Sequence, residues 1–269
     1  MSPPGRPKGE CLSAQREGRP ILPPGRPKGE CLSVQREGRP ILPPGRPKGE
    51  RLSVQREGRP MLPPGRFITF EGIDGAGKST QLGFIEQALR DAGIDLVRTR
   101  EPGGTPLAET LRELILGTPM QPDTETLLVF AARAEHLATV IRPALARGCW
   151  VLCDRFTDAT YAYQAGGRQL SEARIAALEA WVHPDLQPDL TFLVDVPPAV
   201  AAQRLAAVRT ADRFEAETLG FFTRVRALYL QRAERQPERF VVLDGTGAIE
   251  SLRGQIAAQV KLALQRWHG

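Results

Sequence analysis

The chain has 269 residues and carries 36 Lys and Arg against 31 Asp and Glu, a net charge of +5 at pH 7. The positive excess belongs to residues 1–60, which hold 13 basic and 6 acidic residues and leave 23 basic and 25 acidic residues for the rest. The charge of the remainder therefore gives no argument for nucleic-acid binding. No apolar run is long enough to span a bilayer and the N-terminus has no apolar signal segment, so we expect a cytoplasmic protein with no membrane partner.

A tandem repeat rich in Pro, Gly and Arg fills the first 62 residues. The near-identical copies span residues 3–22, 23–42 and 43–62. Each copy has only a few aliphatic side chains, so it cannot bury a core that would offset the entropy of ordering the chain. We expect residues 1–62 to be a disordered tail and residues 63–269 to form one domain. Three interpretations of the tail remain open: the working protein starts near Met61, residues 1–60 are a dispensable extension, or they form a basic arm that binds nucleic acid.

Predicted strands and helices alternate through the rest of the chain. Strands rich in Val, Leu, Ile and Phe are predicted at 67–71, 95–99, 149–154, 190–196 and 240–244. Helices are predicted near 78–92, 106–116, 124–146, 171–182, 198–208, 214–234 and 248–267. Strands that are apolar on both faces suit a parallel sheet covered by helices on each side. The sequence therefore predicts the α/β class, with a doubly wound, five-stranded parallel sheet flanked by helices.

A glycine-rich loop joins the first predicted strand to the first predicted helix. Residues 72–80 match the pattern G-x-x-x-x-G-K-[ST] in the strand, loop and helix setting that binds nucleoside triphosphates. Backbone N–H groups and the helix N-terminus attract phosphate there, Lys78 adds a point charge, and Ser79 offers a hydroxyl to Mg²⁺. The fold is therefore expected to be of the P-loop NTPase type. The expected ATP-binding residues are Gly72, Ile73, Asp74, Gly75, Ala76, Gly77, Lys78, Ser79 and Thr80.

Charged residues also stand where the second and third predicted strands end. Arg100 comes before Pro-Gly-Gly, and Asp154 and Arg155 close the third strand. Ligands of doubly wound sheets bind beyond the carboxyl ends of the strands. Asp154 is the carboxylate expected near Mg²⁺, and the planar guanidinium groups suit phosphate oxygens. Two phosphate subsites are therefore predicted, which indicates a kinase that acts on a phosphorylated acceptor.

Three segments together closely resemble bacterial thymidylate kinase. They are residues 70–80, the Thr-Arg-Glu-Pro-Gly-Gly-Thr of 99–105, and Asp-Arg at 154–155 followed by Ala-Tyr-Gln at 162–164. The resemblance runs from about Phe67 to the C-terminus. It implies a homodimeric enzyme with a LID segment that transfers the γ-phosphoryl group of ATP to dTMP, giving dTDP, with Mg²⁺ as cofactor.

The resemblance also implies roles for individual acceptor-binding residues. Asp74 contacts the 3′-hydroxyl of the deoxyribose, Arg100 and Arg155 hold the acceptor phosphate, and Arg133 reaches the thymine. Further along the chain, Thr160 reads the base edge, Tyr163 crowds the 2′ position, and Gln164 lies beside them. The LID arginine falls on Arg168. The catalytic residues are then Lys78, Arg155 and Arg168.

One position departs from the family pattern. An aromatic residue that stacks on thymine usually stands four residues before the helix arginine, but this position is Val129 and Phe130 follows it. One step along a helix turns the side chain by about 100°. Phe130 is the expected stacking residue, with plain core packing as the alternative interpretation.

The predicted reaction needs no general base. A phosphate monoester is largely a dianion near pH 7, because its second pKa is about 6. Catalysis then consists of holding two anions in line and neutralising charge on the transferred group. Two other functions stay open, a kinase for another nucleoside monophosphate or a deoxynucleoside, and a non-catalytic nucleotide-dependent switch.

Overall fold

The computed structural model describes residues 65–206, residue 214 and residues 217–268. The predicted tail, residues 1–62, and the last two residues of the predicted helix 198–208 lie outside the described residues. None of the described helices is both long enough and apolar enough to cross a membrane.

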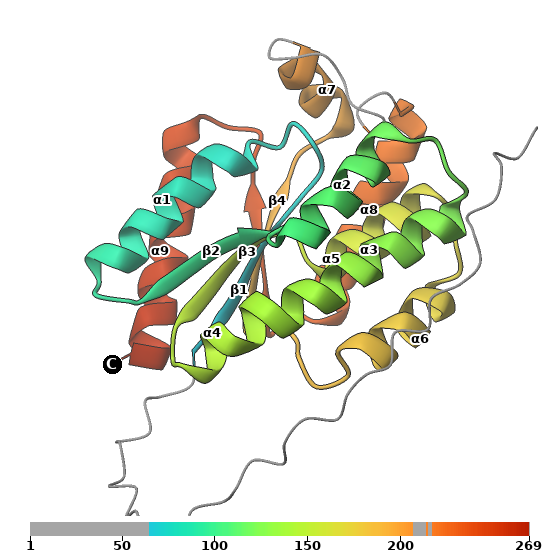
Figure 1. The fold of residues 1–269 in the computed structure, drawn as a ribbon. Helices are drawn as coiled ribbons and strands as arrows, with labels where there is room; N and C mark the ends of the chain where they lie inside the picture. The colour runs from blue at the N-terminus through green and yellow to red at the C-terminus, as the bar shows by residue number, and fades with distance from the viewer. Residues whose placement is uncertain (1–64, 207–213, 215–216, 269) are drawn as a thin grey trace, which may run out of the picture. The chain divides into compact units, whose positions relative to one another are not determined.

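The described residues form one parallel sheet of five strands (Figure 1). The strands are β1 (Phe67–Glu71), β2 (Leu96–Arg100), β3 (Trp150–Asp154), β4 (Leu190–Asp195) and β5 (Phe240–Asp244). Their order across the sheet is β2-β3-β1-β4-β5. The predicted fold class is confirmed, and each strand lies within one residue of its predicted bounds.

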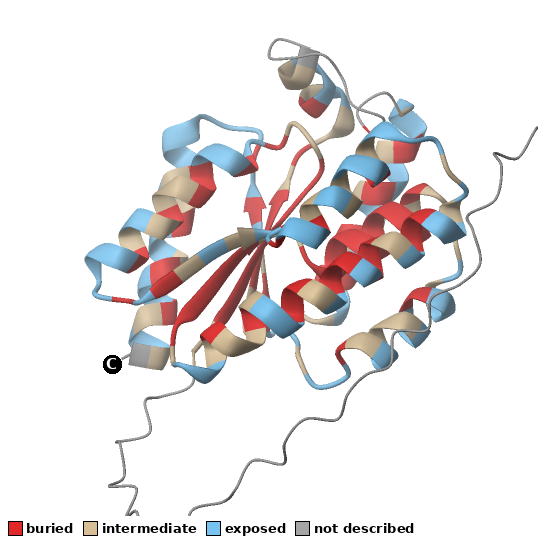
Figure 2. Ribbon diagram, viewed as in Figure 1, coloured by how far each residue is buried: buried red, intermediate tan, exposed pale blue. Residues whose placement is uncertain are grey.

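Register brings the carboxyl ends of three strands to one edge of the sheet. Phe70 of β1 and Arg100 of β2 both pair with Asp154 of β3. The loops that follow these strands therefore start side by side. All five residues of β1 are buried, which fits a central strand covered on both faces (Figure 2).

Helices cover the two faces of the sheet. They are α1 (Lys78–Asp91), α2 (Pro106–Gly117), α3 (Pro122–His136), α4 (Arg142–Ala146), α5 (Thr157–Thr160), α6 (Glu172–Val182), α7 (Pro198–Ala206), α8 (Leu219–Arg235) and α9 (Ile249–His268). Two π-helical segments, η1 (Leu137–Ile141) and η2 (Tyr161–Gly167), continue α3 and α5. The helices α1 and α9 pack together on one side, while α2, α3, α6 and α8 lie on the other (Figure 1).

Three helical segments differ from the sequence prediction. The predicted helix 214–234 begins only at Leu219, because the Thr218 side chain caps it by accepting a hydrogen bond from the Phe221 N–H at 3.2 Å. The predicted helix 124–146 contains the π-helical segment η1 just before Pro143, whose nitrogen cannot donate to the preceding turn. The short helix α5 and the segment η2 carry no clear helical periodicity, and η2 packs along α8.

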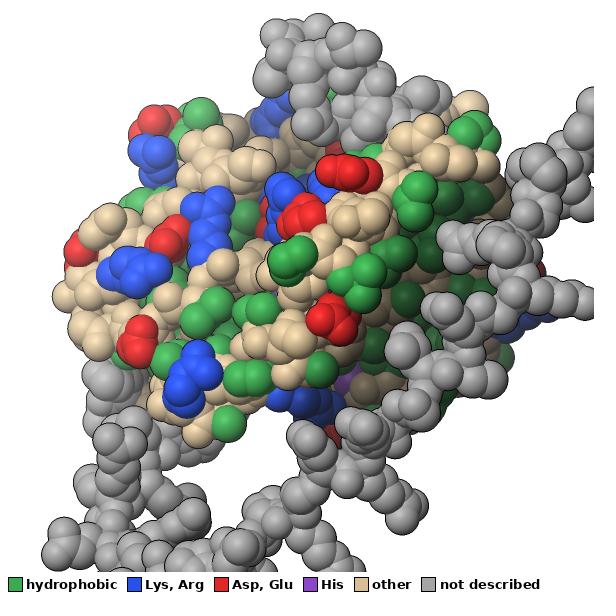
Figure 3. All heavy atoms as spheres, viewed as in Figure 1, with side chains coloured by type: hydrophobic (Ala, Val, Ile, Leu, Met, Phe, Trp, Pro, Cys, Tyr) green, Lys and Arg blue, Asp and Glu red, His purple; other side chains and the backbone are tan. Residues whose placement is uncertain are grey.

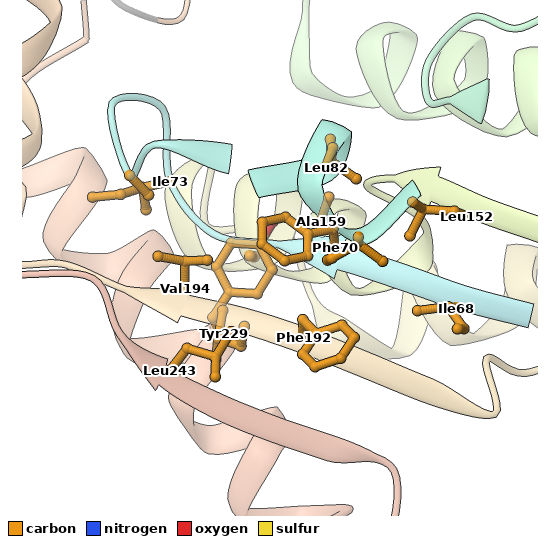
Figure 4. Packing of buried hydrophobic residues seen from close by; sticks show 14 of the residues in the cluster. Ile68, Phe70, Ile73, Leu82, Leu152, Ala159, Phe192, Val194, Tyr229 and Leu243 are labelled. Carbon is orange, nitrogen blue, oxygen red and sulfur yellow. The ribbon is translucent and has the colours of Figure 1, made fainter. Parts of the chain in front are cut away.

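The core joins the sheet to both helical layers. Figure 4 shows Phe70 of β1 beside Phe192 of β4, with their ring centroids 6.0 Å apart. Leu82 reaches this cluster from α1 and Tyr229 reaches it from α8. The strand that leads into the glycine-rich loop is thus fixed from both sides before any ligand binds.

Candidate active site

The glycine-rich loop is shaped by its glycines. Gly72 and Gly75 adopt φ angles of 138° and 82°, and a Cβ added to them would lie 2.6 Å from the Val194 carbonyl oxygen and 2.3 Å from the Ala201 carbonyl oxygen. Any larger residue would therefore displace the loop from β4 and α7. The conformation is that of a loop which turns its backbone toward a phosphate.

Lys78 lies across this loop. Its Nζ atom donates to the carbonyl oxygens of Gly72 at 3.0 Å and Ile73 at 2.9 Å. Burial, and then the positive charge of Arg155, lower the pKa of Lys78 from 10.5 to about 8, against the opposing effect of Asp74. A buried ammonium held by neutral carbonyls is well placed to exchange these bonds for phosphate oxygens.

Arg155 occupies the space between the loop and the end of β3. It adopts a φ of 68°, which turns its side chain back toward β1. Its Nη1 atom donates to the Gly72 carbonyl oxygen at 3.0 Å and the Tyr229 hydroxyl at 3.2 Å. Its Nη2 atom donates to Asp74 at 2.6 Å and to the Tyr163 hydroxyl at 3.0 Å.

Asp74 is ionised in this arrangement. Burial alone would raise its pKa, but the charges of Arg155 and Lys78 and a hydrogen bond from Tyr163 at 2.7 Å lower the pKa to about 2. The carboxylate and the Arg155 guanidinium form an ion pair that is largely shielded from water. This pair connects the phosphate loop to β3.

A second buried arginine, Arg133 of α3, is held from two sides. Its Nε donates to Glu101 at 2.7 Å and its Nη2 donates to the Thr160 hydroxyl at 2.9 Å. Its Nη1 is buried and has no hydrogen-bond partner among the described residues. A charged donor without a partner is costly in a protein interior, so this atom marks a position for a ligand acceptor.

These groups line a cavity of about 110 Å³ at the carboxyl edge of the sheet. It brings together six of the residues predicted to bind the acceptor. They are Asp74, Arg133, Arg155, Thr160, Tyr163 and Gln164. Its walls also include the apolar side chains of Ile115, Leu116 and Val129. The site thus combines the guanidinium groups of Arg112, Arg133 and Arg155, the carboxylates of Asp74 and Glu101, and an apolar wall.

Two of the predicted acceptor-binding residues, Arg100 and Phe130, lie outside the cavity lining, and so does the predicted LID arginine, Arg168. Arg100 pairs with Glu109 at 2.7 Å, and its side chain is 53% exposed. Phe130 is buried and stacks on the ring of His183, with centroids 6.5 Å apart, while Val129 takes the place on the cavity wall. The structure therefore gives Phe130 the alternative role of core packing.

Arg168 follows the η2 segment, which is the expected place for a LID cation. Its guanidinium pairs with Glu217 and, at 3.4 Å, with Glu125. It also lies over the rings of Phe214 and Phe221, 5.2 and 5.0 Å from their centroids. The cation is thus held near the cavity, since Phe214 is also part of the lining.

Sequence reasoning missed several residues of the lining. Arg112 donates to the Pro102 carbonyl oxygen at 2.9 Å, and its pKa is lowered by burial and by the charges of Arg100 and Arg155. Phe156 lies 5.0 Å from the Arg133 guanidinium. No sequence signal separates Arg112 from an ordinary helix-surface arginine, whereas Phe156 directly follows the Asp-Arg pair and was open to prediction.

Ser79 and Asp154 are the residues that could hold a metal. The Asp154 Oδ1 atom is buried and has no hydrogen-bond partner among the described residues, so it is open to a cation. A hydroxyl and a carboxylate oxygen suit Mg²⁺, which commonly completes its coordination with water and phosphate oxygens. Among the residues that the structure describes, no cluster of three or more His, Cys, Asp or Glu side chains could hold a metal alone.

A glycine-rich phosphate loop after β1, an arginine-lined cavity beside it and this parallel sheet define the class of P-loop nucleotide kinases. The sequence model of the thymidylate kinase family matches residues 70–256. Thymidylate kinase of Bordetella pertussis is 60% identical over 196 residues, which cover 73% of this chain and 94% of that protein. The corresponding enzyme of Methylobacillus flagellatus is 58% identical over 191 residues, covering 71% of this chain and 94% of its own.

Solved structures agree with the sequence comparison. The crystal structure of thymidylate kinase from Ehrlichia chaffeensis matches with a TM-score of 0.61 and 33% identity, covering 74% of this chain and 99% of that one. The chain therefore belongs to the thymidylate kinase family.

A buried carboxyl group lies behind Arg155. Glu71, the last residue of β1, accepts hydrogen bonds from the Phe156 N–H at 2.7 Å and the Tyr229 hydroxyl at 2.8 Å. Burial, and then the negative charge of Asp158, raise the pKa of Glu71 from its ordinary 4.5 to about 8. The folded protein therefore keeps a proton on Glu71 at a pH where the unfolded chain has released it.

The first prediction concerns the pH dependence of stability. Because the pKa of Glu71 is higher in the folded state than in the unfolded state, Glu71 stabilises the folded protein. This contribution to the free energy of unfolding is complete below pH 4.5 and is lost as the pH rises toward 8. Glu71→Gln removes the titrating group at nearly constant shape, so its free energy of unfolding, measured in urea, should fall less between pH 5 and pH 8 than that of the parent. Glu86→Gln is the control, because the pKa of Glu86 is lowered by Arg98 and it titrates below this range. Parallel curves for the parent and Glu71→Gln would contradict the assignment.

Proposed function

We propose that the protein transfers the γ-phosphoryl group of ATP to dTMP, giving dTDP, with Mg²⁺ as cofactor. One observation carries the proposal. The cavity beside the phosphate loop is lined by the shielded guanidinium of Arg155 and by Arg133, whose Nη1 atom has no hydrogen-bond partner among the described residues. Membership of the thymidylate kinase family supports the choice of substrates.

The donor site is the glycine-rich loop. Residues 72–80 take the ATP phosphates through backbone N–H groups, and Lys78 exchanges its carbonyl partners for phosphate oxygens. Ser79 and Asp154 would hold Mg²⁺, which neutralises negative charge on the donor phosphates. The open Oδ1 atom of Asp154 supports this assignment.

The acceptor site is the cavity. Arg155 binds the acceptor phosphate while Asp74 and the hydroxyl groups of two tyrosines hold it in position. Arg100 joins the phosphate by leaving Glu109, since a half-exposed ion pair contributes only about 0–1 kcal/mol. Arg112 adds a third guanidinium to the same positive region.

The base and sugar contacts follow from the same lining. Arg133 Nη1 donates to a carbonyl oxygen of the pyrimidine, with Thr160 and Gln164 beside it. Asp74 remains an acceptor for the 3′-hydroxyl because its pKa is about 2. Tyr163, fixed by Asp74 and Arg155, limits the space for a 2′-hydroxyl.

The reaction is a direct displacement between two bound anions. An oxygen of the dTMP phosphate, already deprotonated, forms a bond to the γ-phosphorus, and the bond from this phosphorus to the β,γ-bridging oxygen breaks. Lys78, Arg155 and Arg168 compensate the charge on the transferred group. No side chain has to remove a proton. The protein contributes position and electrostatic stabilisation.

Two copies of the chain are proposed to pair through the face formed by α2, α3 and α6. Exposed apolar residues, mostly small, recur at the helical spacing of one face along α3 and the η1 segment that continues it: Leu127, Ala131, Ala134 and Ala138. Leu107 and Leu114 of α2 and Trp181 of α6 are also exposed, at 52%, 45% and 81%. Figure 3 shows hydrophobic side chains gathered over this region. An apolar face of this kind suits a homodimer. The cytoplasm is the proposed location of the protein, because its substrates would be ATP and dTMP.

A panel of acceptors tests the proposed function. Purified protein with ATP and Mg²⁺ should give the highest kcat/KM with dTMP, compared with dUMP, dCMP, dGMP, AMP and thymidine. A preference for another monophosphate or for thymidine would replace the assigned acceptor. ATP binding with no acceptor consumed would indicate a nucleotide-dependent switch.

Arg168 is the subject of a separate prediction. Because a cation supplied to a phosphoryl-transfer transition state is worth about 10³–10⁵ in rate, Arg168→Ala should lower kcat steeply while the KM for dTMP changes much less. The matched control is Arg174→Ala, which removes an exposed arginine that pairs with the exposed Asp123 at 2.7 Å. Thermal denaturation checks that the variant is folded. Equal and modest losses in kcat and in dTMP affinity would assign Arg168 to binding alone.

A further inference from the structure

A chain of polar side chains runs from β2 to the cavity. The Thr99 hydroxyl lies 2.6 Å from His136 Nε2, and His136 Nδ1 lies 2.9 Å from Glu101 Oε1. Glu101 Oε2 accepts from Arg133 Nε at 2.7 Å. Glu101, His136 and Arg133 are 3%, 0% and 1% exposed. Of these four side chains, only Glu101 and Arg133 line the cavity.

The carboxylate of Glu101 is fixed by two different donors. One oxygen binds His136 and the other binds Arg133, so the carboxylate cannot rotate without losing a buried hydrogen bond. Although burial alone would raise it, the pKa of Glu101 is lowered by the Arg133 charge and by the His136 hydrogen bond. Glu101 is thus an oriented anion whose direction depends on His136.

The orientation of the Glu101 carboxylate determines which nitrogen atom of Arg133 is left for a ligand. With Nε on Glu101 and Nη2 on Thr160, the planar guanidinium has Nη1 left over for a ligand. A shift of Glu101 would turn this plane and withdraw Nη1 from its position. Recognition of the acceptor base therefore depends on a residue outside the cavity.

His136 also supports the loop that follows β2. A Cβ added to Gly104 would lie 2.6 Å from His136 Nε2 and 2.5 Å from the Thr99 hydroxyl oxygen, so the loop rests directly on this pair. The same loop begins with Glu101, directly after Arg100, the last residue of β2. His136 therefore contacts Glu101, which holds Arg133 at the proposed base site, and also the loop that follows Arg100 of the proposed phosphate site.

We infer that His136 is a positioning residue for acceptor recognition: it orients Glu101, and through Glu101 it directs Arg133 Nη1 at a carbonyl oxygen of the acceptor base. The inference rests on the proposed function and extends it to a residue that does not touch the substrate. It also makes His136 a determinant of base specificity. A base that presents an amino group at this position offers no acceptor to Nη1.

Two near-isosteric variants separate the two hydrogen bonds of the imidazole. His136→Asn places an amide nitrogen where Nδ1 stands and keeps the bond to Glu101. His136→Gln places it where Nε2 stands and keeps the bond to Thr99. Because a hydrogen bond to a charged group is worth roughly 1.5–3 kcal/mol, His136→Gln should raise the KM for dTMP by about 10- to 100-fold. His136→Asn should stay much closer to the parent.

Three further readouts distinguish positioning from a general structural effect. The KM for ATP and the kcat should change far less than the KM for dTMP in His136→Gln. The ratio of kcat/KM for dTMP over dCMP should fall, since Nη1 discriminates a carbonyl from an amino group. Glu101→Gln, which keeps the size of the side chain, should reproduce the pattern if the histidine variants fail to fold. Thr99→Val, which removes only the bond to Nε2, should have a small effect.

The inference is overturned if His136→Asn and His136→Gln behave alike, or if Glu101→Gln leaves the KM for dTMP unchanged. A loss of thermal stability without a change in the dTMP to dCMP ratio would make His136 a core residue only. Failure of the parent protein to phosphorylate dTMP would instead remove the proposed function, and this outcome is visible before any variant is compared.

Discussion

The ion pair between Asp74 and Arg155 is the interaction on which the site depends. The parallel pairing of β1 with β3 brings the phosphate loop close to Arg155, and the 2.6 Å contact then joins the two. Burial of a guanidinium is costly unless an opposite charge and hydrogen-bond acceptors compensate it, and here Asp74, Tyr163, Tyr229 and the Gly72 carbonyl oxygen do so. Loss of Asp74 would leave the guanidinium charge uncompensated at the centre of the site, whereas loss of a tyrosine hydroxyl would leave a buried N–H group without its partner.

This arrangement explains how two highly charged ligands can share one crevice. The proposed function assigns Lys78 to the donor side and Arg133 to the acceptor side, with Arg155 between them. In the structure each cation is held by carbonyl oxygens, hydroxyl groups or carboxylates of the protein. The site is therefore preorganised, and ligand oxygens replace or extend existing hydrogen bonds instead of assembling a new framework.

The features that sequence reasoning identified are those with local causes. The strands follow from apolar runs, and the phosphate loop follows from glycines and a lysine at fixed spacing in a strand, loop and helix context. The η2 segment was missed because its packing along α8 is a long-range effect. The position of Arg112 in the cavity lining and the contact of His136 with Glu101 were missed for the same reason, since only tertiary structure shows their partners. Val129 lies on the cavity wall, whereas Phe130, one helical step further along α3, packs against His183.

The central claim is that one chain accommodates a triphosphate donor and dTMP at the same time, with Arg155 between them. Calorimetric titration of dTMP into protein saturated with Mg²⁺ and a non-hydrolysable ATP analogue tests this most directly. The account predicts that dTMP binds to this complex with one site per chain and leaves the analogue in place. Displacement of the analogue by dTMP, or no binding of dTMP to the loaded protein, would contradict the account.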